Sequence, residues 1–211
     1  MYWLYVFLPF ALPLYLIRFQ IFGLSSTLLE VYVGVLLVSF TFFYGWSGWR
    51  VAWQRLGTWR YALVGWIVAT AVAVVVSPSI WSGLGLWRAY VLEPILVFIT
   101  LFVALEKEDI RQKMIRALFG ACWIVVAWAV FQFVTGRGIP YPWNVAIDAG
   151  RRATGPYPFP NALALFVTPI AAFAFGEWIK RPRAYFSLAT VLVSLVGILL
   201  VKSDGGLIAL G

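Results

Sequence analysis

Long runs of apolar residues dominate this sequence, and within them apolar positions do not alternate with polar ones. The runs reach about 17–25 residues, the length that an α-helix needs to cross the hydrocarbon core of a bilayer. Strands of a membrane barrel would be shorter and would alternate apolar with polar positions. The pattern therefore predicts an all-α, polytopic transmembrane helix bundle. The predicted spans are about 3–22, 28–44, 61–77, 87–105, 115–135, 161–178 and 184–201.

The first and last segments depart from this pattern. Pro9, Pro13 and Arg18 interrupt the first predicted span, so we expect it to be kinked, interfacial or re-entrant. Residues 203–211 resemble the start of an eighth span that stops well short of the about 20 residues needed to cross. A stub ending in mid-membrane would leave backbone groups without partners. We therefore interpret 1–211 as the N-terminal fragment of a single transmembrane domain.

The composition supports a membrane location. The chain is 63% hydrophobic and 11% charged, whereas soluble domains have about 45–50% apolar and about 25% charged residues. The net charge of +8 would raise nucleic acid as a partner in a soluble protein. Here the charges lie in short loops between apolar runs, so we expect membrane lipids and no nucleic acid.

The charged loops predict an orientation. Lysine and arginine gather in loops 45–60, 106–116 and 179–183, which share one side if the spans alternate. Because cytoplasmic loops are enriched in these residues, we place these loops and the N-terminus in the cytoplasm, at the inner (plasma) membrane. The long connection 136–160 then lies on the periplasmic or extracellular side, where its glycines and prolines indicate irregular structure.

Two adjacent arginines in that outer loop, Arg151 and Arg152, directly precede the span at 161–178. The positive-inside bias does not account for charges on the outer side. One interpretation is that they reach into lipid headgroups. The other is that they bind the phosphates of an anionic ligand, since a guanidinium matches phosphate oxygens with paired donors. The sequence leaves both open.

Glu93 is the clearest charge inside a predicted span. A carboxylate near the centre of a membrane helix is unfavourable by about 2.5–3.5 kcal/mol, so such residues are functional candidates. Pro94 follows it and should bend the helix. Its partner is expected to be Arg88 or an arginine of the outer loop, although a structural ion pair or a protonated glutamate would also explain it. Lys202 and Asp204 could join an outer site or form a helix-ending turn.

Other chemistries find no support in the residue pattern. The chain has no histidine and a single cysteine, Cys122, which lies inside an apolar run. Spacings typical of metal sites, and the glycine-rich loops that hold nucleotides, are absent from the sequence. We predict no metal and no cofactor.

Four segments together resemble the O-antigen ligase and O-antigen polymerase family of polytopic membrane proteins. They are PLYLIRFQIFGLSSTLLEVYV (13–33), SGLGLWRAYVLEPILVFI (82–99), RATGPYPFPNALALFVTPIAAF (152–173) and LLVKSDGGLIAL (199–210). The resemblance covers nearly the whole chain, and the N-terminal part of such a family member. Asp204 stands where the family pattern has a basic residue.

The resemblance implies a membrane glycosyltransferase of lipopolysaccharide and cell-envelope biosynthesis. Such a protein moves a glycan from undecaprenyl diphosphate to an acceptor glycan or glycolipid at the outer face of the inner membrane, without metal or nucleotide sugar. It makes Arg152 the expected diphosphate contact, with Arg151 or Arg88 assisting, Glu93 orienting an arginine and Asn161 shaping the start of its span. The family's expected catalytic histidine is absent here, so the catalytic residue is unknown.

Two other classes of function stay open at this point. The first is a small membrane transporter or lipid-binding protein that uses Glu93 as an intramembrane switch. The second is a structural subunit without chemistry of its own.

Overall fold

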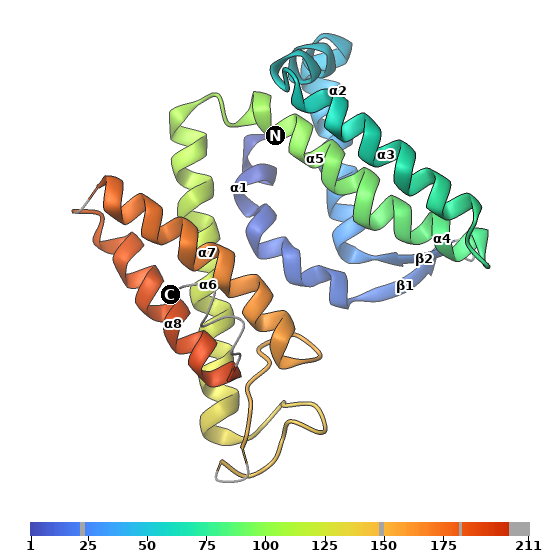
Figure 1. Cartoon of the computed structure of the whole chain (residues 1–211). Helices are drawn as coiled ribbons and strands as arrows, with labels where there is room; N and C mark the ends of the chain where they lie inside the picture. The colour runs from blue at the N-terminus through green and yellow to red at the C-terminus, as the bar shows by residue number, and fades with distance from the viewer. Residues whose placement is uncertain (22–23, 148–149, 182, 203–211) are drawn as a thin grey trace. The chain divides into compact units, whose positions relative to one another are not determined.

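The computed structural model describes residues 1–21, 24–147, 150–181 and 183–202 (Figure 1). Its architecture is helical, as predicted, with one short β-hairpin. The chain divides into two compact units, Met1–Met114 and Ile115–Gly211. The interpretation of 1–211 as a single transmembrane domain stays a prediction. The predicted start of an eighth span, 203–211, lies outside the described residues, as does Asp204.

The first unit contains most of the elements. They are α1 (Tyr2–Ala11), the 3₁₀ helix η1 (Leu12–Leu16), β1 (Arg18–Ile21), β2 (Leu24–Thr27), α2 (Leu28–Arg55), α3 (Trp59–Val75), α4 (Ile80–Trp87), the π-helical turn η2 (Arg88–Leu92) and α5 (Glu93–Ala104). The long helix α6 (Glu108–Thr135) begins at the end of this unit and continues into the second. The second unit adds α7 (Pro160–Lys180) and α8 (Tyr185–Val201).

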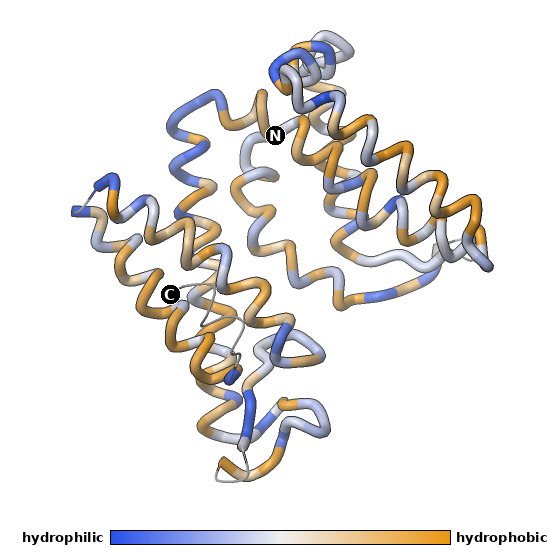
Figure 2. The backbone as a smooth tube through the Cα atoms, in the orientation of Figure 1, coloured by the Kyte–Doolittle hydropathy of each residue, from blue (hydrophilic) through white to orange (hydrophobic). Residues whose placement is uncertain are grey.

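Four helical segments in the described part of the chain are long and apolar enough to cross a membrane. They are Leu28–Arg55, Ile80–Ala104, Glu108–Thr135 and Pro160–Lys180. Three further apolar segments, Tyr2–Leu16, Trp59–Val75 and Tyr185–Val201, are shorter, at 10–17 residues. The prediction of apolar helices long enough to span a membrane is therefore confirmed for four segments, and about seven full spans is more than the structure shows. In Figure 2 apolar residues run along the helices, and hydrophilic ones gather in the connections α5–α6 and α7–α8.

The first predicted span, 3–22, is not one continuous helix. The helical segment ends at Leu16, and β1 and β2 follow as an antiparallel pair with Arg18 opposite Thr27. Pro9 lies inside α1 and Pro13 lies at the start of η1. Each proline lacks a backbone N–H donor, and this loss weakens an α-helix. The apolar composition of 3–22 predicted a membrane segment. It did not reveal the change from helix to strand after Leu16.

Helix α2 has a well-defined start and an internal break. Its first turn carries a capping box, in which the Glu30 N–H donates to Thr27 Oγ1 and the Thr27 N–H donates to the Glu30 carboxylate, each at 3.3 Å. Inside the helix Gly45 adopts φ 59° and ψ −165°, a conformation that glycine allows at low cost. The residues after Gly45 therefore follow a new direction.

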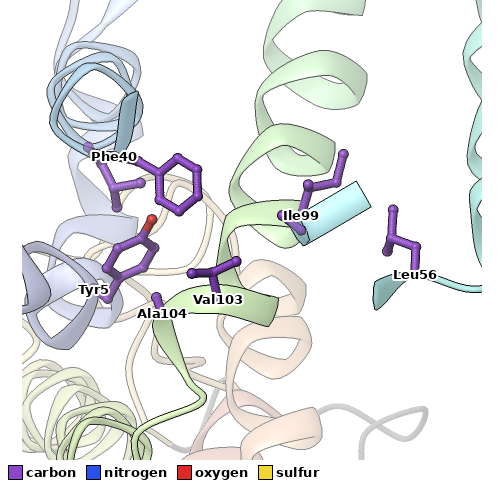
Figure 3. Packing of buried hydrophobic residues seen from close by; sticks show 8 residues of the cluster. Tyr5, Phe40, Leu56, Ile99, Val103 and Ala104 are labelled. Atoms are coloured by element: carbon purple, nitrogen blue, oxygen red, sulfur yellow. The ribbon is translucent and has the colours of Figure 1, made fainter. Parts of the chain in front are cut away.

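The core of the first unit lies between α1, α2 and α5. Figure 3 shows Tyr5 and Phe40 lying close to Val103 and Ala104 of α5. Phe40 also meets Trp49 edge-on, with ring centroids 5.0 Å apart, across the break at Gly45. This packing holds the two halves of α2 against the same apolar cluster.

In the second unit α8 packs against α6 and α7 through small residues. A Cβ built on Gly197 would lie 2.9 Å from a methyl carbon of Val126 and 3.7 Å from one of Val167. Polar pairs join the same helices, since the Trp123 indole N–H donates to Thr190 Oγ1 at 3.0 Å. Close approach through small residues, with hydrogen bonds between helices, is typical of packing in membranes.

Candidate functional site

Arg151 caps the end of a helix. Its Nη1 donates to the carbonyl of Phe133 in the last turn of α6 at 2.9 Å, and its Nε donates to the carbonyl of Val145 at 2.8 Å. The end of a helix leaves carbonyl groups without helical partners, and a basic side chain satisfies them. Gly136 lies directly beneath, because a Cβ there would come within 2.9 Å of Arg151 Nη2. Two of the three guanidinium nitrogens of Arg151 thus donate hydrogen bonds to backbone carbonyls.

Arg152 caps a different helix end. Its Nε donates to the carbonyl of Val201 at 2.7 Å, and its Nη2 donates to the carbonyl of Lys202 at 3.3 Å, at the end of α8. The same Nη2 donates to Asn161 Oδ1 at 3.2 Å. The guanidinium carbon lies 5.0 Å from the ring centre of Trp143, a stacking arrangement. Arg152 and Asn161, both predicted site residues, are therefore in direct contact.

The start of α7 completes this cationic site. Its N-cap residue, Phe159, offers no side-chain acceptor, and Pro160 follows at the first helical position. The N-terminus of a helix carries unpaired N–H groups and a partial positive charge, both favourable for anions. Arg152 Nη1 makes no hydrogen bond to any residue in the described ranges. The half-buried Arg152 thus has one nitrogen available beside an uncapped helix start.

The sequence interpretation missed Gln132 of α6, a residue that is 1% exposed. Its Oε1 accepts from the N–H groups of Thr154 and Gly155, at 3.1 and 2.8 Å. Its Nε2 donates to the carbonyls of Gly138 and Gly155, each at 2.8 Å. The signal was present, because an uncharged polar residue inside the apolar stretch WAVFQFVT needs hydrogen-bond partners when buried.

The other two predicted site residues, Arg88 and Glu93, lie in the first unit. Arg88 Nε is 3.5 Å from Glu93 Oε1, which identifies the partner that the sequence had offered as one alternative. Arg88 Nη2 also pairs with the Glu30 carboxylate and donates to Ser26 Oγ at 3.3 Å. These contacts tie the hairpin and the start of α2 to the π-helical turn. Such a turn inside a helix is often associated with function.

Charge distinguishes the two groups of residues. Arg88 lies between two carboxylates, and its side chain is 36% exposed while those of Glu30 and Glu93 are 13% and 18% exposed. This cluster carries one negative charge in excess when all three groups are ionised, which is unfavourable for binding phosphate. The group around Arg152 has no acidic partner among the described residues. Among the described residues, the charges around Arg152 are thus more favourable for an anion than those around Arg88.

Comparison with known proteins adds no relative. No protein-family model matches the chain, and no curated protein or solved structure is similar to it. In the part of the chain that the structure describes, no three histidine, cysteine or acidic side chains gather as a metal-binding group.

Proposed function

We propose that this chain binds an undecaprenyl diphosphate-linked glycan at the outer face of the inner membrane and takes part in transferring the glycan to an acceptor, as O-antigen ligases and polymerases do. The observation that carries the proposal is the Arg152 site. There a guanidinium with an available nitrogen lies beside the uncapped start of α7, a helix long enough to cross a bilayer. A lipid-linked diphosphate presents its anionic group at the membrane surface, the level at which a spanning helix begins.

The proposal includes a membrane arrangement. The shorter segments Tyr2–Leu16, Trp59–Val75 and Tyr185–Val201 join the four long ones to give about seven membrane segments. The basic loops face the cytoplasm, as the positive-inside rule predicts. The 136–160 loop, Arg152 and the start of α7 then face the periplasm or exterior.

Arg152 is the favoured diphosphate contact because the other two candidate arginines, Arg151 and Arg88, already bind other groups. Arg151 donates to two backbone carbonyls and packs on Gly136. Arg88 is paired with two carboxylates. In the transfer step the acceptor hydroxyl oxygen forms a bond to the anomeric carbon and its proton is released to solvent. The bond from that carbon to the diphosphate oxygen breaks, and its electron pair stays on the departing diphosphate. A cation at the departing diphosphate stabilises the charge that develops there.

Ligand binding by the whole chain in lipid nanodiscs tests this proposal. The affinities for undecaprenyl diphosphate and for uncharged undecaprenol are compared for the wild type and for Arg152→Ala. We expect the wild type to prefer the diphosphate and the variant to lose about tenfold or more of that preference, because a charge-assisted hydrogen bond is removed. Arg137→Ala is the matched control, since Arg137 is an exposed arginine of the same loop. Equal loss in both variants, or none in Arg152→Ala, would contradict the proposal.

Glycan transfer is the second measurement. A wild-type chain given an undecaprenyl diphosphate-linked glycan and an acceptor glycolipid should release undecaprenyl diphosphate, and Arg152→Ala should release it more slowly at equal expression. Normal release by Arg152→Ala would exclude Arg152 from the site.

A second candidate function rests on the Glu30–Arg88–Glu93 cluster. Two carboxylates that share one arginine, within or beside helices long enough to cross a membrane, could carry a proton or cation during transport. A chain of this type could alternatively bind lipid at the same cluster. In reconstituted vesicles with a pH gradient, such a transporter would move protons, and Glu93→Gln would stop it. Proton flux equal to that of protein-free vesicles would exclude this transport function.

A further inference from the structure

The carboxamide of Gln132 pairs with the backbone of a segment more than twenty positions later in the chain. Gly155 donates its N–H to Gln132 Oε1 and accepts from Gln132 Nε2, both at 2.8 Å and with a sequence separation of 23. The side-chain amide therefore pairs with both the N–H and the carbonyl of Gly155, as the backbone of a neighbouring β-strand would. Oε1 also accepts from the Thr154 N–H at 3.1 Å, and Nε2 also donates to the Gly138 carbonyl at 2.8 Å.

These bonds use the whole hydrogen-bonding capacity of a primary amide, which has two donors and an oxygen that accepts twice. Water cannot readily replace the carboxamide at the N–H groups of Thr154 and Gly155, because Thr154 is fully buried and Gln132 is 1% exposed. A shorter amide would reach fewer of these partners, and an apolar side chain would leave the N–H groups of Thr154 and Gly155 without their acceptor. Both the amide group and the side-chain length of Gln132 thus suit the hydrogen bonds to Thr154, Gly155 and Gly138.

The segment that Gln132 holds leads directly into Arg152. The Ala153 N–H donates to the Leu200 carbonyl at 3.0 Å, and Arg152 Nε donates to the Val201 carbonyl at 2.7 Å. Residues 152–155 are therefore tied to the end of α8 at one end and to Gln132 of α6 at the other. A shift of Thr154 and Gly155 would move the backbone that carries the guanidinium.

We propose that Gln132 is a positioning residue that fixes Arg152, through Thr154 and Gly155, beside Asn161 at the start of α7. The identity of the ligand of Arg152, a diphosphate, rests on the proposed function. The positioning itself follows from the hydrogen bonds alone. Gln132 makes no contact with the ligand and acts only on where the guanidinium lies.

The position of Arg152 can be measured without any ligand through Trp143. The guanidinium carbon of Arg152 lies 5.0 Å from the centre of the Trp143 ring. The whole chain is labelled with 5-fluorotryptophan and studied by ¹⁹F NMR in nanodiscs, with Trp143→Phe identifying the Trp143 signal among the 12 tryptophans. Arg152→Ala sets the signal expected when the cation is lost from the ring. We expect Gln132→Met to move the Trp143 signal toward that value and Gln132→Asn, which keeps the amide on a shorter stem, to move it partly.

Gln112→Met is the matched control, because Gln112 lies on the same helix and its amide makes only a solvent-exposed bond to Glu108, at 2.8 Å. It should leave the Trp143 signal unchanged. A wild-type signal in folded Gln132→Met and Gln132→Asn would overturn the positioning role. Loss of folding in both variants would also overturn it, since Gln132 would then serve the fold as a whole.

Diphosphate binding provides the second reading. If Gln132 acts through Arg152, Gln132→Met should lose about tenfold in diphosphate preference, and the double variant Gln132→Met/Arg152→Ala should lose no more than Arg152→Ala alone. Additive losses would contradict action through Arg152. A moved Trp143 signal without any effect of Arg152→Ala on binding would keep the positioning role and remove the proposed ligand. The two failures are thereby distinguished.

Discussion

Arg152 Nη2 donates a 3.2 Å hydrogen bond to Asn161 Oδ1, and this bond links the 136–160 loop to the first turn of α7. Replacing Asn161 by aspartate would keep the acceptor and add a negative charge beside the guanidinium. We predict that Asn161→Asp lowers the affinity for undecaprenyl diphosphate by about tenfold, through charge competition for Arg152. Titration of nanodisc-bound chain with the lipid checks this. Asn161→Leu removes the acceptor without adding charge and should retain more affinity, so an equal loss in both variants would argue against the charge effect.

Gly197 of α8 lies directly against Val126 of α6, with 2.9 Å between a Cβ built on Gly197 and a methyl carbon of Val126. The branched valine has little freedom to move aside. We predict that Gly197→Ala lowers the free energy of unfolding by about 1–3 kcal/mol, the usual cost of overpacking. Thermal unfolding in detergent measures the change. Gly176→Ala is the control, because nothing lies within 4 Å of the added carbon, and a loss there as large as at Gly197 would contradict the packing explanation.

Arg151 should matter for stability and not for ligand binding. Arg151→Met removes the donors to the Phe133 and Val145 carbonyls. We predict a loss of about 1–2 kcal/mol in the free energy of unfolding, because Arg151 is only half-buried and water replaces part of the interaction. The preference for diphosphate over undecaprenol should remain. Unfolding and binding are both measured on the same preparation, and a variant with normal stability but lost preference would reverse the assigned roles of the two arginines.

Arg88 should stabilise the first unit by separating two carboxylates. We predict that Arg88→Met destabilises the chain by less than the about 3–5 kcal/mol of fully buried pairs, because Arg88 is 36% exposed. Adding Glu93→Gln to Arg88→Met should restore part of the stability, since one unpaired charge is then removed. A thermal-unfolding cycle of the two single variants and the double variant gives the coupling. No recovery in the double variant would show that the ion pair with Glu93 contributes little.

The orientation of the chain in the membrane is tested with a thiol placed in the 136–160 loop. Asn144 is exposed, so Asn144→Cys in a Cys122→Ser background should react with a membrane-impermeant thiol reagent added outside intact cells. The single native cysteine is buried and is removed to give a silent background. Reaction only after the membrane is permeabilised would reverse the orientation that the basic loops predict.

The sequence predicted the helices well because apolar run length is a strong signal. The runs at 115–135 and 161–178 correspond to Glu108–Thr135 and Pro160–Lys180. The extra residues at the start of α6 include the charged Glu108, Asp109, Arg111 and Lys113, and hydropathy does not extend a span into such residues. They form helix nonetheless, supported by the Lys113–Asp109 pair at 2.7 Å.

Features set by single residues were harder to predict. The break at Gly45 depends on a positive φ, and a glycine in an apolar run is equally compatible with close helix packing. The hairpin of Arg18–Ile21 and Leu24–Thr27 lies in a stretch that is more polar than the helices on either side, and these polar residues do not distinguish a hairpin from a loop. Pro94 did predict an irregularity in its helix, and the π-helical turn Arg88–Leu92 immediately precedes Glu93.

The candidate site was only partly visible in the sequence. The pattern placed Arg151, Arg152 and Asn161 near one another because they flank the start of one helix. It did not distinguish the two arginines, since their roles depend on which backbone carbonyls approach them from α6 and α8. The partners of Gln132 are also distant in sequence, and they become apparent only when the loop folds back onto the helix.

Arg151 and Arg152 hold the ends of two different helices, α6 through Phe133 and α8 through Val201. Consecutive Cα atoms are about 3.8 Å apart, so the pair works as a fixed-length staple between the two helix ends. Inserting a single residue between them would force one end to release its arginine. The spacing of this dipeptide therefore encodes a tertiary distance, and loop length is constrained more strictly at this bond than its surface location suggests.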